Sequence, residues 1–238
     1  MHQALQNKEF KMFLQPKFNL KNDELVGAEA LVRWQKPDGT YRYPNEFIPL
    51  FESNGFCIKL DTFMIEQACE QLRKWMDDGL KPVPISVNQS KILFLDKNYP
   101  DNLEKILDKY NIPSSLITLE ILEGIASDDL ELLKRQIDIL HSKGFKVSMD
   151  DFGKGYSSLN MLYQLRIDEL KLDRGFLKKV PEDDEKRRYI ILRQVISLAK
   201  KLGIKTVAEG IETAEDREAV IALSCDYGQG YLYGKPID

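Results

Sequence analysis

The sequence predicts an α/β fold, specifically a modified TIM (β/α)8 barrel with one antiparallel strand. Three observations lead to this prediction. The length of 238 residues suits one barrel. Short apolar runs alternate with amphipathic helical stretches, which is typical of a parallel sheet with crossover helices. Finally, the number of apolar runs, eight, is the number that closes such a barrel.

The first two candidate strands require a departure from an ideal barrel. In chain order the candidates are Met12–Phe18, Leu25–Arg33, Val83–Asn88, Leu116–Ile121, Lys146–Asp151, Glu169–Asp173, Lys205–Glu209 and Tyr227–Tyr231. The connection around Asn22-Asp23 is too short for a parallel crossover, so we expect the first pair to be antiparallel.

Two helices are predicted most clearly. The apolar face of the first consists of Leu130, Leu133, Ile137 and Leu140, and that of the second of Ile191, Val195, Leu198 and Leu202. Ser127 is expected to cap the first helix, and Gly144 and Gly203 to end the two. Both faces are interpreted as core. The mixed charge run Glu182–Arg188 is interpreted as a solvated loop, and Ala4–Phe10 as the tail of a helix.

Composition excludes several classes of function. The net charge is −4, and the sequence contains no basic stripe, which argues against binding of a long nucleic acid. Three cysteines without a CxxC pair exclude a disulfide framework or zinc cluster and favour a cytoplasmic location. No apolar run reaches the length of a membrane span. Of two histidines, His141 is expected to be a cation at a helix C-terminus. We predict one domain, residues 1–238, cut from a longer protein.

Polar side chains that are costly to bury recur at the ends of the predicted strands. They are Glu29, Asn88, Glu120, Asp150, Asp151, Lys171, Glu209 and Gln229. A buried carboxylate must be paired or bound to a metal, because its desolvation alone costs several kcal/mol. The C-terminal ends of barrel strands meet at one mouth. We therefore expect Glu29, Asn88, Glu120, Asp150, Asp151 and Glu209 to form one cluster.

Oxygen ligands without histidine or cysteine select Mg²⁺, Mn²⁺ or Ca²⁺ over zinc. Five carboxylates exceed what one such ion takes from a protein, so two ions with a shared carboxylate are expected. A single acid at a strand end is more often a cap or a surface residue. The pair Asp150-Asp151 resists that interpretation, because adjacent carboxylates repel unless a cation or a proton lies between them. Both can face one site only where their strand is ending. Lys171 is interpreted as an ion-pair partner of Glu209 or Asp151, a role compatible with catalysis.

The same residues lie in motifs that resemble those of the EAL domain family. Ten motifs follow in the family's order: Gln15-Pro16, Glu29-Ala30-Leu31 continuing to Arg33-Trp34, Phe47-Ile48-Pro49-Leu50, Ser86-Val87-Asn88, Leu119-Glu120-Ile121 with Glu123, Asp150-Asp151-Phe152-Gly153, Gly155-Tyr156-Ser157-Ser158, Leu170-Lys171-Leu172-Asp173, Ala208-Glu209-Gly210 with Glu212, and Gly228-Gln229-Gly230-Tyr231-Leu232. The similarity covers residues 10 to 236, and ten motifs in order are far more specific than three letters.

The resemblance implies Mg²⁺- or Mn²⁺-dependent hydrolysis of cyclic di-GMP to linear pGpG. It implies a first ion held by Glu29, Asn88, Glu120 and Asp150, and a second shared by Asp150 with Asp151, with Glu209 nearby. Lys171 would orient or stabilise the attacking water and Gln229 would position the site. Glu123 would brace the loop 151–158. The dinucleotide cleft would be lined by Gln15, Leu31, Arg33 and Pro49. A homodimer, and a GGDEF or sensor domain elsewhere in the full-length chain, are also implied.

One residue departs from the family pattern, in which a small residue lies between Gly153 and Gly155. Here it is Lys154, which we expect to point to solvent, with the cleft as the alternative. Two other functions compete with hydrolysis of cyclic di-GMP. One is a receptor of the same fold that binds without cleaving, and the other is an unrelated Mg²⁺-dependent barrel enzyme. A protein-interaction scaffold would leave the buried acids unexplained.

Overall fold

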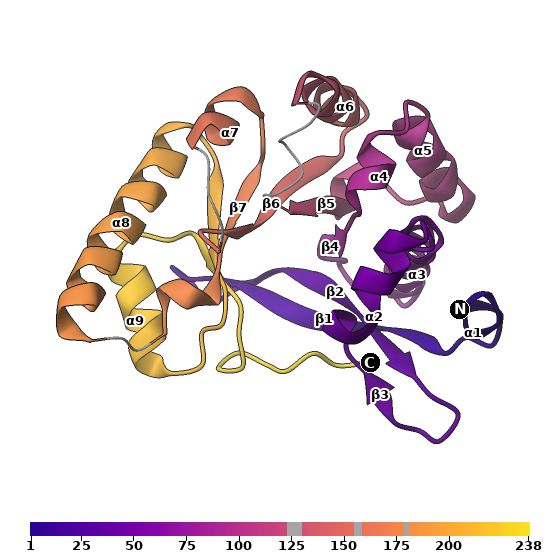
Figure 1. Ribbon diagram of the computed structural model, residues 1–238, viewed down its shortest axis with the longest axis horizontal. Helices are drawn as coiled ribbons and strands as arrows, with labels where there is room; N and C mark the ends of the chain where they lie inside the picture. Colours follow the sequence, from indigo (N-terminus) through magenta and orange to yellow (C-terminus); the bar gives the residue numbers. More distant parts are fainter. Residues whose placement is uncertain (123–129, 155–158, 179–180) are drawn as a thin grey trace.

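Eight strands form a closed barrel in the computed structural model, which describes residues 1–122, 130–154, 159–178 and 181–238 (Figure 1). The strands are β1 (Phe10–Asn19), β2 (Leu25–Gln35), β4 (Ile85–Asn88), β5 (Ile117–Leu122), β6 (Lys146–Phe152), β7 (Glu169–Leu172), β8 (Lys205–Ala208) and β9 (Tyr227–Gly228). Their order is β1-β9-β8-β7-β6-β5-β4-β2, and pairing of β1 with β2 closes the ring. A further strand, β3 (Tyr41–Arg42), pairs with the end of β2 and was not predicted.

The short connection at Asn22-Asp23 makes the first two strands antiparallel, as predicted. β1 runs antiparallel to both of its neighbours, β2 and β9, while the other neighbouring barrel strands are parallel. Asp23 adopts a left-handed backbone conformation with φ of 56° in the connection. The predicted barrel with one antiparallel strand is therefore confirmed.

Helices surround the barrel, as Figure 1 shows for α3, α5, α6 and α8. The helices are α1 (His2–Gln6), α2 (Pro44–Ser53), α3 (Cys57–Asp77), α4 (Lys91–Phe94), α5 (Tyr99–Tyr110), α6 (Leu130–Ser142), α7 (Leu159–Gln164), α8 (Glu182–Lys201) and α9 (Ala214–Ala222). The predicted apolar face of α6 is buried at Leu133, Ile137 and Leu140. Its predicted cap, Ser127, lies outside the described residues.

Three local predictions were wrong, two of them only in part. The buried side of α8 consists of Leu192, Val195, Ile196 and Ala199, while Ile191 and Leu202 are about half exposed. The charge run Glu182–Arg188 forms the first turns of α8 instead of a loop, since a solvated helix face accommodates mixed charges as well as a loop does. The N-terminal helix ends at Gln6, and Phe10 begins β1 because it packs into the aromatic cluster with Trp34 and Phe47.

The two faces of the barrel strands differ in character. Side chains that alternate outward pack beneath the helices and are apolar, for example Val87, Leu119 and Met149. Side chains that alternate inward are polar: Ser86, Thr118, Ser148 and Glu169 are all buried. Across the interior, Lys17 of β1 forms an ion pair with Glu169 of β7. The polar interior leads upward to the carboxyl ends of the strands, where the acidic side chains lie.

Candidate metal centre

One buried lysine holds four carboxylates together at the mouth of the barrel. The Nζ atom of Lys171 lies 3.1 Å from Glu29 Oε2, 2.7 Å from Glu120 Oε2, 3.1 Å from Asp150 Oδ1 and 2.9 Å from Glu209 Oε1. The carboxylates belong to β2, β5, β6 and the residue directly after β8, and Lys171 belongs to β7. The side chain of Lys171 is only 2% exposed. The predicted convergence of distant strand ends is thus present in the structure.

Two amide side chains complete the cluster. Asn88 donates from Nδ2 to Glu29 Oε1 at 3.2 Å. Gln229 donates from Nε2 to Glu29 Oε2 at 2.6 Å and to Glu209 Oε1 at 3.2 Å. Since charge-assisted hydrogen bonds fix the carboxylate planes, these amides orient the oxygens that face the centre of the mouth.

The carboxylates form two overlapping groups that can hold a metal ion. In one group, ligand oxygens of Glu29, Glu120 and Asp150 lie within 4.8 Å of one another, and in the other those of Asp150, Asp151 and Glu209 do. Asp150 belongs to both groups. The donors are all oxygens, as hard divalent ions require, and the site already accommodates a buried cation in Lys171. The residues therefore fit one or two divalent ions.

The backbone at the end of β6 explains how neighbouring aspartates share one site. The pairing of β6 with β7 shifts register between Met149 and Phe152, and Asp151 adopts a φ of 58°. This left-handed residue breaks the alternation that would send the side chains of Asp150 and Asp151 to opposite faces. Gly153 follows with a φ of 95°, where an added Cβ would lie 2.3 Å from Phe176. The turn thus depends on Gly153.

Burial and charge set the protonation of the cluster. Burial raises the pKa of Glu209 to about 8 although Lys171 opposes the shift, and burial also raises the pKa of Glu120 and Asp150. For Glu29, burial is outweighed by Lys171 and the amide donors, so its pKa is lowered. The pKa of Lys171 is raised, because the surrounding carboxylates outweigh its own desolvation. Without a divalent ion, the negative charge of the carboxylates is therefore neutralised partly by bound protons and partly by Lys171.

The raised pKa of Glu209 predicts an inverse dependence of stability on pH in metal-free protein. Between its ordinary value of 4.5 and about 8, the folded state keeps a proton that the unfolded state releases. The contribution of this group to the free energy of unfolding therefore falls as pH rises across that window. We expect melting temperatures measured in chelator to fall more steeply from pH 5 to pH 8 in wild type than in Glu209→Gln. Parallel curves for the two proteins would show that Glu209 titrates normally.

A cleft with a volume of about 470 Å³ lies beside the carboxylates. Its lining includes Leu31, Pro49, Asn88, Asp150 and Asp151. In the described part of the chain, neither Gln15 nor Arg33 lines this cleft. Gln15 donates to the backbone of Gly234 at 3.5 Å, and the Arg33 guanidinium lies 5.0 Å from the ring centre of Tyr43. Of the four residues that the family resemblance assigns to a dinucleotide cleft, Leu31 and Pro49 line the cleft beside the carboxylates.

Lys154 is exposed to solvent and also lines the cleft, the two orientations considered for it. Its side chain is 64% exposed, yet Nζ lies 2.8 Å from Asp151 Oδ2 and the residue lines the cleft. Of the two alternative ion-pair partners predicted for Lys171, the described residues show Glu209, at 2.9 Å. Glu123 and the segment 155–158 lie outside the described residues.

Sequence reasoning missed Asp61 on α3. This carboxylate is buried in the wall of the cleft, where it accepts a hydrogen bond from the backbone N–H of Ser90 at 2.8 Å. Burial raises its pKa to about 6. The signal in the sequence was an aspartate next to the apolar positions Leu60 and Met64 of an amphipathic helix.

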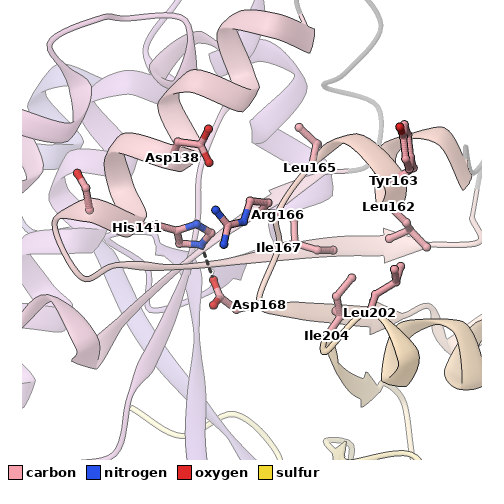
Figure 2. Close-up of a pocket in the computed structure, with 11 residues that line it drawn as sticks. Asp138, His141, Leu162, Tyr163, Leu165, Arg166, Ile167, Asp168, Leu202 and Ile204 are labelled. Carbon is pink, nitrogen blue, oxygen red and sulfur yellow. Dashed lines mark hydrogen bonds and ion pairs between the residues drawn. The ribbon is translucent and has the colours of Figure 1, made fainter.

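A second hollow, with a volume of about 770 Å³, lies where β7 and β8 begin, at the opposite end of these strands from the carboxylate cluster (Figure 2). His141 Nε2 and Asp168 Oδ2 lie 2.9 Å apart in its wall, and Asp168 also accepts a hydrogen bond from the backbone N–H of Val147 at 2.8 Å. His141 thus lies in the last turn of α6 as predicted, with an acidic partner. The contacts join α6 to the starts of β6 and β7, which is a structural role.

Among the described parts of the chain, no helix combines the length and hydrophobicity needed to span a bilayer. Fold and site together define an α/β-barrel protein with an oxygen-rich site for divalent ions at the carboxyl ends of its strands. Comparison with known proteins gives the family: the EAL domain matches residues 1–236, and the chain belongs to the EAL domain family.

Similar proteins include signalling enzymes with longer chains. The bifunctional diguanylate cyclase/cyclic di-GMP phosphodiesterase MucR of Pseudomonas aeruginosa is 34% identical over all of this chain and 34% of its own length. The probable cyclic di-GMP phosphodiesterase PdeG of Escherichia coli is 34% identical, again over all of this chain and 46% of its own length. The chain spans between about a third and a half of these relatives.

Solved structures agree closely with the fold. The PaMucR phosphodiesterase in complex with c-di-GMP superposes with a TM-score of 0.92 at 34% identity, over 99% of this chain and 95% of that one. The EAL enzyme Bd1971 with cAMP and cyclic di-GMP bound gives a TM-score of 0.91 at 35% identity, over all of this chain and 64% of that one.

Proposed function

We propose that this chain hydrolyses cyclic di-GMP to linear pGpG and that it needs two Mg²⁺ or Mn²⁺ ions to do so. The observation that carries the proposal is the pair of overlapping carboxylate groups that share Asp150 at the mouth of the barrel. The relatives MucR and PdeG are named as phosphodiesterases of this dinucleotide, and PaMucR was solved in complex with it.

The metal ligands follow from the two groups. Glu29, Glu120 and Asp150, with Asn88 beside them, would hold one ion, and Asp150 and Asp151 would hold the other, with Glu209 adjacent. When bound, a divalent ion lowers the pKa of a coordinated water towards about 7 and neutralises phosphate charge.

The remaining roles belong to side chains of the chain itself. Lys171 keeps a positive charge at the reacting phosphate and orients the attacking water. Glu209, beside Asp150 and Asp151, would accept a proton from that water as a carboxylate. Gln229 holds Glu29 and Glu209 in position. Leu31 and Pro49 contact the dinucleotide in the cleft. Contacts from Gln15 and Arg33 stay predictions from the family resemblance. Bracing of the loop 151–158 by Glu123 stays a prediction from the family resemblance.

The partners are part of the same proposal. MucR is named as bifunctional and DosP of Escherichia coli as an oxygen sensor, and this chain covers 34% and 29% of their lengths. We infer that a GGDEF or sensor domain accompanies the EAL domain in a longer protein. The homodimer and the cytoplasmic location stay predictions.

The test is incubation of the purified chain with cyclic di-GMP and Mn²⁺, followed by chromatography for pGpG. We expect pGpG to accumulate with Mn²⁺ and to be lost when the metal is chelated. Binding of cyclic di-GMP without pGpG would identify a receptor. Hydrolysis at an undiminished rate in chelated, metal-free protein would contradict the assigned role of the carboxylates.

A further inference from the structure

Lys154 lies against the outer of the two carboxylate groups, at the end formed by Asp151. The two residues belong to one tight turn, in which the backbone N–H of Lys154 donates to the carbonyl of Asp151 at 3.1 Å. The turn directs Nζ of Lys154 to within 2.8 Å of Asp151 Oδ2. Asp151 is 28% exposed, and both residues line the cleft.

The two carboxylate groups therefore differ in their lysine contacts. Lys171 contacts all three residues of the inner group, Glu29, Glu120 and Asp150. Of the outer group, Lys171 contacts Asp150 and Glu209, while Lys154 contacts Asp151. An ion bound to the outer group through Oδ2 of Asp151 would need the oxygen that the ammonium of Lys154 occupies.

We propose that Lys154 is a tethered competitor of the outer divalent ion, because its ammonium and the ion exclude each other at Asp151. The inference rests on the proposed function only in assigning metal ions to these carboxylates. It predicts that the outer group binds its ion more weakly than it would with a neutral residue at position 154. The inner group is affected less, since the direct contact of Lys154 is with Asp151, whereas Lys171 contacts all three residues of the inner group.

The size of the effect follows from the exposure of the pair. Lys154 is 64% exposed, and ion pairs in water shift an equilibrium by about 1.4- to 5-fold. Repulsion between the displaced ammonium and the bound dication acts in the same direction. We therefore expect removal of the Lys154 charge to strengthen binding of the weaker ion about two- to fivefold.

The experiment is calorimetric titration of Mn²⁺ into the metal-free 238-residue chain without substrate. Lys154→Met and Lys154→Thr should each strengthen the weaker of two binding events about two- to fivefold, whereas Lys154→Arg should match wild type. Lys109→Met is the matched control, since Lys109 forms an ion pair of similar exposure with Glu66 away from the barrel mouth. Unchanged affinity in both neutral variants would overturn the inference, as would an equal shift in the Lys109 control.

A double-mutant cycle tests that the competition occurs at Asp151. In an Asp151→Asn background, Lys154→Met should no longer change Mn²⁺ affinity, and a shift of undiminished size there would overturn the inference. Because no substrate is present, the outcome is separable from the proposed function. A shift in Mn²⁺ affinity in a chain that does not cleave cyclic di-GMP would support competition by Lys154 and reject the phosphodiesterase activity. Wild-type protein with a single Mn²⁺ site would overturn the competition whatever the activity.

Discussion

Asp150→Asn is expected to lower the kcat/KM of the chain more than about 100-fold while leaving the metal-free protein at least as stable as wild type. Asp150 is shared by both carboxylate groups, so its replacement weakens both ion sites at once. Loss of a residue that merely supports a metal ligand lowers metal affinity or activity about 10- to 100-fold, and loss of a shared ligand is expected to lower them further. Stability is retained because burial raises the pKa of Asp150, which means that its charge is unfavourable in the metal-free fold.

The measurement is steady-state hydrolysis of cyclic di-GMP in Mn²⁺ alongside thermal unfolding in chelator. Asp138→Asn serves as the control, since it removes an exposed carboxylate far from the barrel mouth and should leave both quantities near wild type. A large loss of stability in Asp150→Asn would indicate a structural residue instead of a metal ligand.

Lys171→Met is expected to lower activity by about 10²- to 10³-fold, the usual cost of removing one preorganised electrostatic contact. It also removes the counter-ion of four buried carboxylates. Breaking a buried ion pair from one side costs about 3–5 kcal/mol, so the metal-free variant should unfold at markedly lower denaturant concentration near neutral pH. Mn²⁺ can replace the missing positive charge, and saturating Mn²⁺ should therefore recover much of the lost stability but not the activity.

Lys17→Met is the matched control for this prediction. Lys17 is also buried and forms an ion pair with Glu169, but at the other end of the barrel interior. Its replacement should destabilise the chain to the same extent with and without Mn²⁺. Equal recovery of both variants by Mn²⁺ would mean that the metal acts elsewhere than at the carboxylates around Lys171.

The architecture was predictable from the sequence where short-range rules decide the outcome. The turn at Asn22-Asp23 is too short for a crossover, and β1 is antiparallel as a result. The positions of Glu29, Glu120, Asp150 and Glu209 at strand ends required that they meet, since parallel strands end at one mouth. Local packing was less predictable: the core face of α8 includes Leu192 and Ala199, because burial depends on the angle at which the helix crosses the sheet.

The details of the site depended on backbone geometry that no residue pattern specifies. Asp150 and Asp151 share a site because the register shift and the positive φ of Asp151 break the strand alternation. The same turn brings Lys154 to Asp151, although its exposure agrees with the expectation that long cations face solvent. Lys171 pairs with four carboxylates because it lies at the centre of the mouth, a position that sequence spacing does not reveal.

Anomalous diffraction from crystals soaked in Mn²⁺ tests most directly whether acids from separate strands bind a pair of ions. The account predicts two manganese peaks, one among Glu29, Asn88, Glu120 and Asp150 and one between Asp150 and Asp151 beside Glu209. Manganese bound away from these side chains, or no bound manganese at concentrations that support hydrolysis, would contradict it.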